Sequence, residues 1–204
     1  MKYEVIDKKR IFDEFFTIEK ADVKYERFRD GSWNRSRRYN LQRPEAAAII
    51  LENESTGNIV LVEQFRYATV EAAGRDGWTL EIVAGLVDKG ETPERCAIRE
   101  SLEEAGYRVR NPRYLCSYFT SVGISDEKVH LYYGQVCDRD RVAEGGGLAS
   151  ENEDLAVREI PLTELMSLLK NGKIADAKTI VALQWLALER IADRQRLKNR
   201  PLSP

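Results

Sequence analysis

The chain has 204 residues, a formal net charge of −2 and 43% hydrophobic residues. Its length suits one domain of ordinary size, or one domain with a small addition, and its apolar content is enough for a buried core. The weak net charge gives no general attraction to nucleic acid, and no apolar run is long enough to cross a bilayer, so we expect neither nucleic acid nor membrane as a partner.

The N-terminal sequence MKYEVIDKKRIFDE is too highly charged for a signal peptide. The three cysteines, Cys96, Cys116 and Cys137, are odd in number and lack the spacing of metal ligands. We therefore expect reduced thiols and a cytoplasmic protein. His130 is the single histidine, which excludes sites that need two imidazoles, such as a typical catalytic zinc centre.

Residues 1–43 differ in character from the rest of the chain and predict a small N-terminal β domain. A strand over residues 15–28, a tight turn at Asp30-Gly31 and a returning strand over residues 32–41 form the expected hairpin. A lone hairpin is only marginally stable in water, so we expect this domain to pack on another surface, such as a second subunit.

Residues 44–195 mix strand and helix patterns and are expected to form the main domain, and residues 196–204 are expected to be a flexible tail. Pro44 marks the boundary. The expected strands cover residues 46–51, 59–65, 80–84, 114–120, 129–136 and 155–160, and two later helices cover residues 162–170 and 177–194.

The last helix repeats apolar residues at helical spacing, so we expect it to cover the sheet. These residues are Ile180, Val181, Trp185 and Leu188, with Gln184 as the exception. Packing in the core explains Trp185 better than a stacked ligand does. His130 lies in an apolar and aromatic run, and we expect it in a strand rather than in a catalytic triad.

Residues 92–106 predict a further helix with well-defined ends. Thr92 is a good N-cap, Pro93 suits the first helical position, and Gly106 favours a stop. The side of this helix that we expect to face the core carries Ile98, Ser101, Leu102 and Ala105.

Three carboxylates, Glu100, Glu103 and Glu104, gather near the C-terminal end of this helix. At about 100° per residue they fall within an arc of roughly 100°, away from the side expected to face the core. Like charges four residues apart and the negative end of the helix dipole each disfavour this arrangement by some tenths of a kcal/mol. A bound cation would reverse these costs, whereas a solvated glutamate-rich surface explains the same residues without one.

The residues before the helix favour the cation site. In GLVDKGETPERCAIRESLEEAGY, residues 85–107, a glycine is followed at fixed spacing by Glu91, the pair Arg99-Glu100 and the pair Glu103-Glu104. This pattern resembles the Nudix box of hydrolases that cleave a nucleoside diphosphate linked to another group. Ser101 departs from it, because the family usually has an aliphatic residue there. The resemblance implies an α+β fold, the Nudix α/β/α sandwich.

The stretch GGGLASENED, residues 145–154, adds Glu151, Glu153 and Asp154 beyond the helix. Its three glycines predict a mobile loop. By itself this segment fits a flexible acidic surface loop. Beside a metal-binding helix, it could supply another ligand and a general base.

A closer resemblance covers most of residues 15–190. The loop, the segment KIADAKTIVALQWL (residues 173–186), the N-terminal hairpin, LVEQFR (residues 61–66) and LEIVAGL (residues 80–86) resemble the ADP-ribose pyrophosphatases of this family. They resemble the related GDP-mannose pyrophosphatases somewhat less well.

The resemblance implies a metal site and its ligands. Glu100 and Glu104 would bind the divalent ions, with the Ala84 carbonyl and Glu103 nearby, and Glu153 would join them in a closed state. Because carboxylates are the plentiful ligands, we expect the hard ion Mg²⁺, or Mn²⁺. The number of ions stays open.

The same resemblance implies catalytic roles. Glu151 would act as the base toward the attacking water, although the choice between Glu151 and Glu153 stays open. Arg99 would hold the helix carboxylates in place, and Glu91 would support the loop before the helix.

It also implies substrate contacts. Arg66 would meet the diphosphate and Glu127 the far ribose. Arg37 or Arg38 would reach the nucleotide from the other subunit of an exchanged homodimer, while a solvated basic strand explains these two arginines equally well. Where relatives often have Ser-Pro-Gly-Gly, this chain has SVGI at residues 121–124, which would reshape the sugar side of the pocket.

The predicted function is hydrolysis of the diphosphate bond of a nucleoside diphosphate sugar with Mg²⁺, and the best candidate reaction converts ADP-ribose to AMP and ribose 5-phosphate. GDP-mannose or a UDP-sugar is the alternative substrate. A sensor that binds a nucleotide sugar without cleaving it is the alternative from another class. It is disfavoured because every acidic position of the box is present and no DNA-reading segment is evident.

Overall fold

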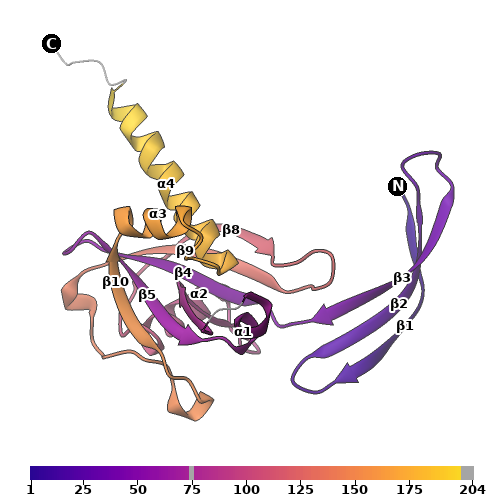
Figure 1. Ribbon diagram of the computed structural model, residues 1–204, viewed down its shortest axis with the longest axis horizontal. Helices are drawn as coiled ribbons and strands as arrows, with labels where there is room; N and C mark the ends of the chain where they lie inside the picture. Colours follow the sequence, from indigo (N-terminus) through magenta and orange to yellow (C-terminus); the bar gives the residue numbers. More distant parts are fainter. Residues whose placement is uncertain (74–75, 199–204) are drawn as a thin grey trace. The chain divides into compact units, whose positions relative to one another are not determined.

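The computed structural model describes residues 1–73 and 76–198, which fall into two compact units (Figure 1). The N-terminal unit joins Met1–Ala46 to Ser117–Val129. The second unit joins Ala47–Cys116 to the residues from His130 onward and holds most of the sheet and the helices.

The N-terminal unit contains a three-stranded antiparallel meander of β1 (Tyr3–Asp13), β2 (Thr17–Glu26) and β3 (Trp33–Gln42). The predicted hairpin corresponds to β2 and β3. β1 was not predicted, because all of its residues are exposed and it therefore has no buried face to mark it in the sequence.

The segment that links β8 (Arg113–Phe119) to β9 (Lys128–Val136) is tied to the end of β3. The Leu41 amide donates to the Ile124 carbonyl at 2.7 Å. The Asp126 carboxylate accepts from the Asn40 side chain at 2.8 Å and from the Arg43 amide at 2.9 Å. These bonds explain why a segment far along the sequence belongs to the N-terminal unit.

The second unit is built on a seven-stranded sheet in the order β10-β5-β4-β9-β8, with β6 pairing β5 and β7 pairing β4. Its remaining strands are β4 (Ala46–Asn53), β5 (Asn58–Phe65), β6 (Trp78–Glu81), β7 (Val83–Leu86) and β10 (Ala156–Pro161). The single strand predicted over residues 80–84 is therefore two strands. They separate at Ile82, whose amide donates to the Thr179 hydroxyl at 2.9 Å.

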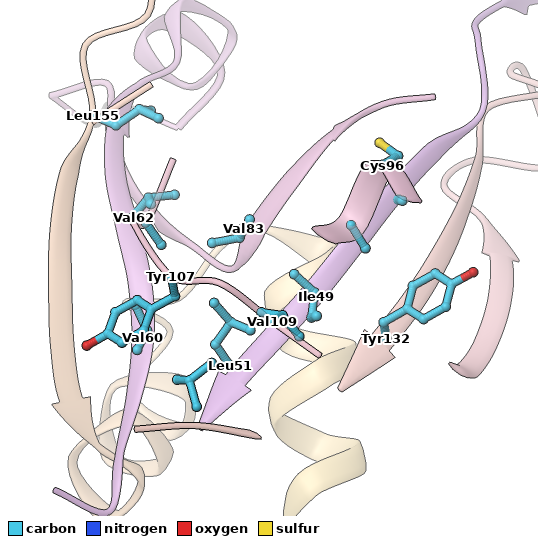
Figure 2. Packing of buried hydrophobic residues seen from close by; sticks show 14 residues of the cluster. Ile49, Leu51, Val60, Val62, Val83, Cys96, Tyr107, Val109, Tyr132 and Leu155 are labelled. Atoms are coloured by element: carbon cyan, nitrogen blue, oxygen red, sulfur yellow. The ribbon is translucent and has the colours of Figure 1, made fainter. Parts of the chain in front are cut away.

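Both faces of the central strands are buried. On one face, Ile49 and Val62 belong to a cluster that also contains Cys96 and Ala97 of helix α2 (Pro93–Glu103), as Figure 2 shows in part. Ile50 and Leu61 alternate with them, point to the opposite face and are equally buried. A sheet covered on both faces confirms the predicted α+β sandwich.

Three further helices complete this unit: α1 (Tyr67–Ala73), α3 (Leu162–Lys170) and α4 (Ala177–Lys198). α3 has the predicted bounds. α1 was not predicted. α4 includes residues 196–198, which were expected in the flexible tail, and residues 199–204 lie outside the described residues. In the described part of the chain, no helix combines the length and apolar character needed to span a bilayer.

The buried face of α4 differs from the predicted one. Thr179, Ala182, Leu183 and Leu186 are buried, whereas Leu188 is 66% exposed. The spacing of apolar residues predicted the wrong face, because Thr179 is polar and yet fully buried. Its hydroxyl accepts from the Ile82 amide and donates to Asp176. Trp185 is half-buried and packs against the ring of Tyr133 at 5.9 Å, which supports its predicted packing role.

This assignment of the α4 face predicts opposite outcomes for two leucine truncations. Leu183→Ala should lower the free energy of unfolding by about 2–5 kcal/mol, because it leaves a cavity in the core. Leu188→Ala is the matched control on the exposed face of the same helix, and it should change the free energy of unfolding by less than about 0.5 kcal/mol. Urea unfolding measures both, and equal losses would contradict the assignment.

Candidate metal and phosphate site

Helix α2 begins and ends where the sequence predicts. The Thr92 hydroxyl accepts from the Arg95 amide at 3.3 Å, and Pro93 occupies the first helical position. At the other end Gly106 has a φ of +77°, and its amide and that of Tyr107 bond back to the last turn. The Gly106 amide bonds to the Leu102 carbonyl four residues back, which is the αL type of helix end, and glycine adopts this conformation without backbone strain.

Arg99 is the centre of an ion-pair cluster on α2. Its Nε and Nη2 donate to the two oxygens of Glu91, both at 3.1 Å. Its Nη1 donates to Glu100 at 2.7 Å and to Glu103 at 2.9 Å. These hydrogen bonds raise the pKa of Arg99, and the bond to Glu91 has the largest effect. The same bond lowers the pKa of Glu91. One guanidinium therefore fixes three carboxylates from the helix and the loop before it.

The acidic side of α2 is buried, which corrects the expectation that it lies away from the core. Glu100 is 7% exposed and Glu104 is 3% exposed, whereas Leu102, expected in the core, is exposed. The reason is β7, which packs against this side of the helix: the Ala84 amide donates to Glu104 at 3.0 Å.

Gly85 allows this close approach. A Cβ atom at this position would lie 1.7 Å from the Glu100 carboxylate oxygen. Beside it, the Cys96 thiol donates to the Gly85 and Leu86 carbonyls, and burial raises the pKa of this thiol to about 12. Cys96 therefore fills space under the site as a neutral group.

Burial and mutual repulsion dominate the electrostatics of the two buried carboxylates. Burial, opposed by Arg99 and reinforced by Glu103 and Glu153, raises the pKa of Glu100 to about 7. Burial, opposed by the Ala84 amide and reinforced by Glu100 and Glu153, raises the pKa of Glu104 to about 8. The positive charges near these two carboxylates do not offset their burial, and a bound cation would add the positive charge that does.

The glycine-rich loop closes over the C-terminal end of α2. The amides of Gly146 and Gly147 donate to the carbonyls of Glu104 and Glu103 at 2.8 and 3.0 Å. A Cβ on Gly145 would lie 2.6 Å from the Glu104 carbonyl oxygen. These glycines, predicted only to give mobility, also satisfy helix carbonyls that would otherwise be unpaired.

The two loop glutamates differ in their surroundings. Glu153 accepts a hydrogen bond from the Leu148 amide at 3.0 Å, and its charge acts on Glu100 and Glu104. Glu151 ends a short 3₁₀ turn, is exposed, and has no side-chain partner among the described residues.

Glu81 is a buried site residue that we did not predict. Its two oxygens accept from Nε and Nη2 of Arg66, each at 2.9 Å, and one also accepts from Lys178 at 2.5 Å. Burial disfavours its charged form, but Arg66 and Lys178 outweigh this and lower its pKa to about 2. A charged residue inside the apolar run LEIVAGL was the signal in the sequence.

Lys178 and Arg66 both act on the acidic helix. Lys178 also pairs with Asp176 at 3.0 Å, and its charge opposes the rise in the pKa of Glu104. The charge of Glu104 in turn helps to raise the pKa of Arg66, after the larger effect of the Glu81 hydrogen bonds. Two cations thus lie within electrostatic reach of the buried carboxylates.

The remaining predicted substrate residues lie in the N-terminal unit. Arg37 pairs with Asp22 at 3.0 Å, and Arg38 lies over the ring of Tyr25. Glu127 accepts from the Thr120 hydroxyl at 2.9 Å and pairs with Arg43 at 3.6 Å. At the departure from the family pattern, Val122 and Ile124 are 85% and 57% exposed.

The donor set around α2 fits a hard divalent cation. It consists of carboxylate oxygens, which such ions prefer, and the two that are buried carry a raised pKa. Across the described ranges, however, no three His, Cys, Asp or Glu side chains already converge as a metal site. Glu100 and Glu103 face Arg99 instead, so ion binding has to compete with that guanidinium.

Comparisons with known proteins agree with this geometry. Residues 42–183 match the family model of the NUDIX domain. A GDP-mannose pyrophosphatase of Cronobacter sakazakii is 36% identical, over 95% of this chain and 99% of the relative. An ADP-ribose pyrophosphatase of Haemophilus influenzae is 34% identical, over 91% of this chain and 86% of the relative.

A solved structure has the same fold. The crystal structure of a protein described as an ADP compounds hydrolase is similar with a TM-score of 0.72. The similarity covers 96% of this chain and 97% of that one, at 22% identity.

The contact at Gly85 predicts a selective defect. In Gly85→Ala the new methyl group should displace the flexible Glu100 side chain and weaken Mn²⁺ or Mg²⁺ binding, with little loss of stability. Gly123→Ala, where a Cβ meets nothing within 4 Å, is the matched control. Calorimetric titration with the ion measures the effect, and unchanged binding in Gly85→Ala would remove Glu100 from the site.

The raised pKa values of Glu100 and Glu104 predict the pH dependence of the metal-free protein. Between about pH 5 and 8 the folded state keeps protons that the unfolded chain releases, so the free energy of unfolding should fall as pH rises. At about 1.4 kcal/mol per pKa unit, each of the two groups should contribute a few kcal/mol to this fall. Denaturant unfolding in EDTA should show this fall, and Glu104→Gln should reduce it. A flat profile would contradict the assigned burial.

Proposed function

The chain belongs to the NUDIX family, and from this premise we propose that it hydrolyses the diphosphate bond of a nucleoside diphosphate sugar. The preferred substrate in this proposal is ADP-ribose, which would be cleaved to AMP and ribose 5-phosphate. The observation that carries the proposal is the cluster in which Arg99 fixes Glu91, Glu100 and Glu103 while Glu104 is buried beside it. Such crowding of buried negative charge is costly in a fold that does not use it.

Glu100 and Glu104 would hold Mg²⁺, with Mn²⁺ as the other candidate, and the Ala84 carbonyl, Glu103 and Glu153 would complete the ligands. When bound, the ion neutralises phosphate charge and lowers the pKa of a bound water. Arg99 keeps the carboxylates in position, and Glu91 keeps Arg99 in position, because their two-point contact restricts both side chains.

Arg66 would bind the diphosphate. Its contacts with Glu81 use Nε and Nη2, and its Nη1 has no hydrogen-bond partner among the described residues. Glu81 therefore orients the guanidinium and leaves one edge free for a phosphate oxygen. The half-exposed side chain of Arg66 is accessible to such a ligand.

Glu151 would take the proton from the attacking water. It is exposed, and the adjacent glycines allow the backbone conformations that a moving loop needs. Glu153 is the less suitable base, because its hydrogen bond to the Leu148 amide and its effect on Glu100 and Glu104 favour the metal-ligand role.

The proposal includes two domains, an N-terminal β domain of residues 1–43 and a hydrolase domain of residues 44–195. It also includes an exchanged homodimer. The support is β1, on which Tyr3, Val5 and Phe12 are exposed apolar residues. Arg37 or Arg38 would then contact the nucleotide in the partner's site, and Glu127 the far ribose. The molecular mass in solution tests the dimer.

GDP-mannose is the second candidate substrate. The specific reason is the similarity to the GDP-mannose pyrophosphatase of Cronobacter sakazakii, which this chain matches over nearly the whole length of that relative. The exposed Val122 and Ile124, where relatives often have Pro and Gly, would be the residues that distinguish the sugars.

A substrate panel with Mg²⁺ tests the proposed function. Phosphate released after phosphatase treatment should be greatest for ADP-ribose, compared with GDP-mannose and a UDP-sugar. Glu104→Gln, which keeps the side-chain shape, should lower turnover by orders of magnitude, and Glu94→Gln, an exposed residue of the same helix, should not. Substrate that stays intact in the wild-type reaction would support the sensor instead, and a near-normal rate in Glu104→Gln would refute the metal assignment.

A further inference from the structure

Three arginines line a hollow in the second unit that shares no residue with the acidic site. Arg108, Arg110 and Arg139 surround a volume of about 490 Å³ together with Gln135, Cys137 and Asp140. The Arg108 amide donates to the Asp140 carbonyl at 2.8 Å, which fixes the two segments against each other. The hollow is therefore built by the fold and not by a single loose loop.

No acidic side chain bonds directly to the three guanidinium groups in the described part of the chain. Arg110 and Arg139 act on Asp140 only through their charges, which help the Cys137 hydrogen bonds to lower its pKa. All three residues are exposed, and none has a side-chain hydrogen bond or ion pair among the described residues. Asp140 is the one carboxylate in the lining, and it accepts from the Cys137 amide at 2.9 Å and from the Cys137 thiol at 3.0 Å. Three positive side chains thus face one carboxylate that is already hydrogen-bonded elsewhere.

This arrangement differs from that of two other exposed arginines of the second unit. Arg158 pairs with Glu63 at 2.8 Å, and Arg113 pairs with Glu189 at 3.4 Å. Guanidinium groups match phosphate oxygens in charge and in planar two-point geometry. Several unpaired arginines around one hollow of this size therefore favour a small ligand that carries phosphate.

A second hollow of about 530 Å³ continues the first, because Arg110 and Gln135 line both. It adds the aromatic rings of Tyr133 and Trp185, with the Arg113 guanidinium 5.4 and 4.7 Å from their centroids. Aromatic rings, a cation and the amide of Gln135 are groups that bind a nucleobase by stacking and hydrogen bonding.

We propose that the two adjoining hollows form a second ligand site, which binds a nucleoside phosphate. Arg108, Arg110 and Arg139 hold the phosphate groups, and the base lies beside Trp185. A long nucleic acid fits less well, because a chain of net charge −2 has no general attraction for an extended phosphate backbone. The proposal does not depend on the reaction at the acidic site.

Calorimetric titration of the full chain with ADP and with inorganic pyrophosphate, in EDTA and low salt, tests the site. Removal of divalent ions leaves the carboxylates of the acidic site to repel both probes. We expect each probe to bind with one-to-one stoichiometry and to weaken as salt is added. The double substitution Arg108→Gln with Arg139→Gln should weaken both by at least about tenfold.

Two further variants separate the parts of the site. Arg158→Gln removes an exposed arginine that has an acidic partner, and it should leave both affinities unchanged. Trp185→Leu should weaken ADP but not pyrophosphate, because only ADP carries a base.

Four outcomes would overturn the proposal. The first is unchanged binding in the double variant, and the second is an equal loss in Arg158→Gln. The third is loss of binding in Arg66→Gln but not in the double variant, which would place the probe at the acidic site. The fourth is much tighter binding of a single-stranded oligonucleotide than of ADP, which would make nucleic acid the ligand.

Discussion

The contact of one guanidinium with three carboxylates holds the candidate site together. Glu91, Glu100 and Glu103 would repel one another without Arg99. Glu104 is buried next to them, and within residues 1–73 and 76–198 no cationic side chain forms a hydrogen bond with it. Removal of one partner from such a cluster leaves uncompensated buried charge, which is far more costly than loss of an exposed ion pair. Burial, reinforced by repulsion between the carboxylates, raises the pKa of both buried glutamates. A bound divalent cation would offset both effects, which is why this cluster favours such an ion as its ligand.

The backbone around the cluster is also constrained, because two glycines leave room for atoms of the site. Gly85 leaves room for the Glu100 carboxylate, and Gly145 leaves room for the last carbonyls of α2. At both places an added Cβ would collide with an atom of the site, so close packing and function depend on the same positions. The glycine-rich loop thereby has two roles, since it closes the helix end and carries the glutamates proposed as ligand and base.

Charge is distributed unevenly over the second unit. At the acidic site, Arg66 and Lys178 both pair with the buried Glu81, whose pKa is about 2, so they are fixed in place and partly screened. At the proposed second site, Arg108, Arg110 and Arg139 have no such partner among the described residues. A protein of small net charge can therefore present one region that attracts cations and another that attracts phosphates.

Local features of the fold were predictable from the sequence, because they depend on neighbouring residues. Thr92 with Pro93 determined where α2 begins, the bounds of α3 followed from its pattern, and the spacing of glutamates after Gly85 indicated the family that the match over residues 42–183 confirms. The tertiary structure alone decided that Glu100 and Glu104 are buried, that Glu81 meets Lys178 across 97 residues of sequence, and that α4 buries Thr179 instead of Leu188. Burial and charge compensation depend on pairs of groups that only the folded chain brings together, and no local pattern specifies them.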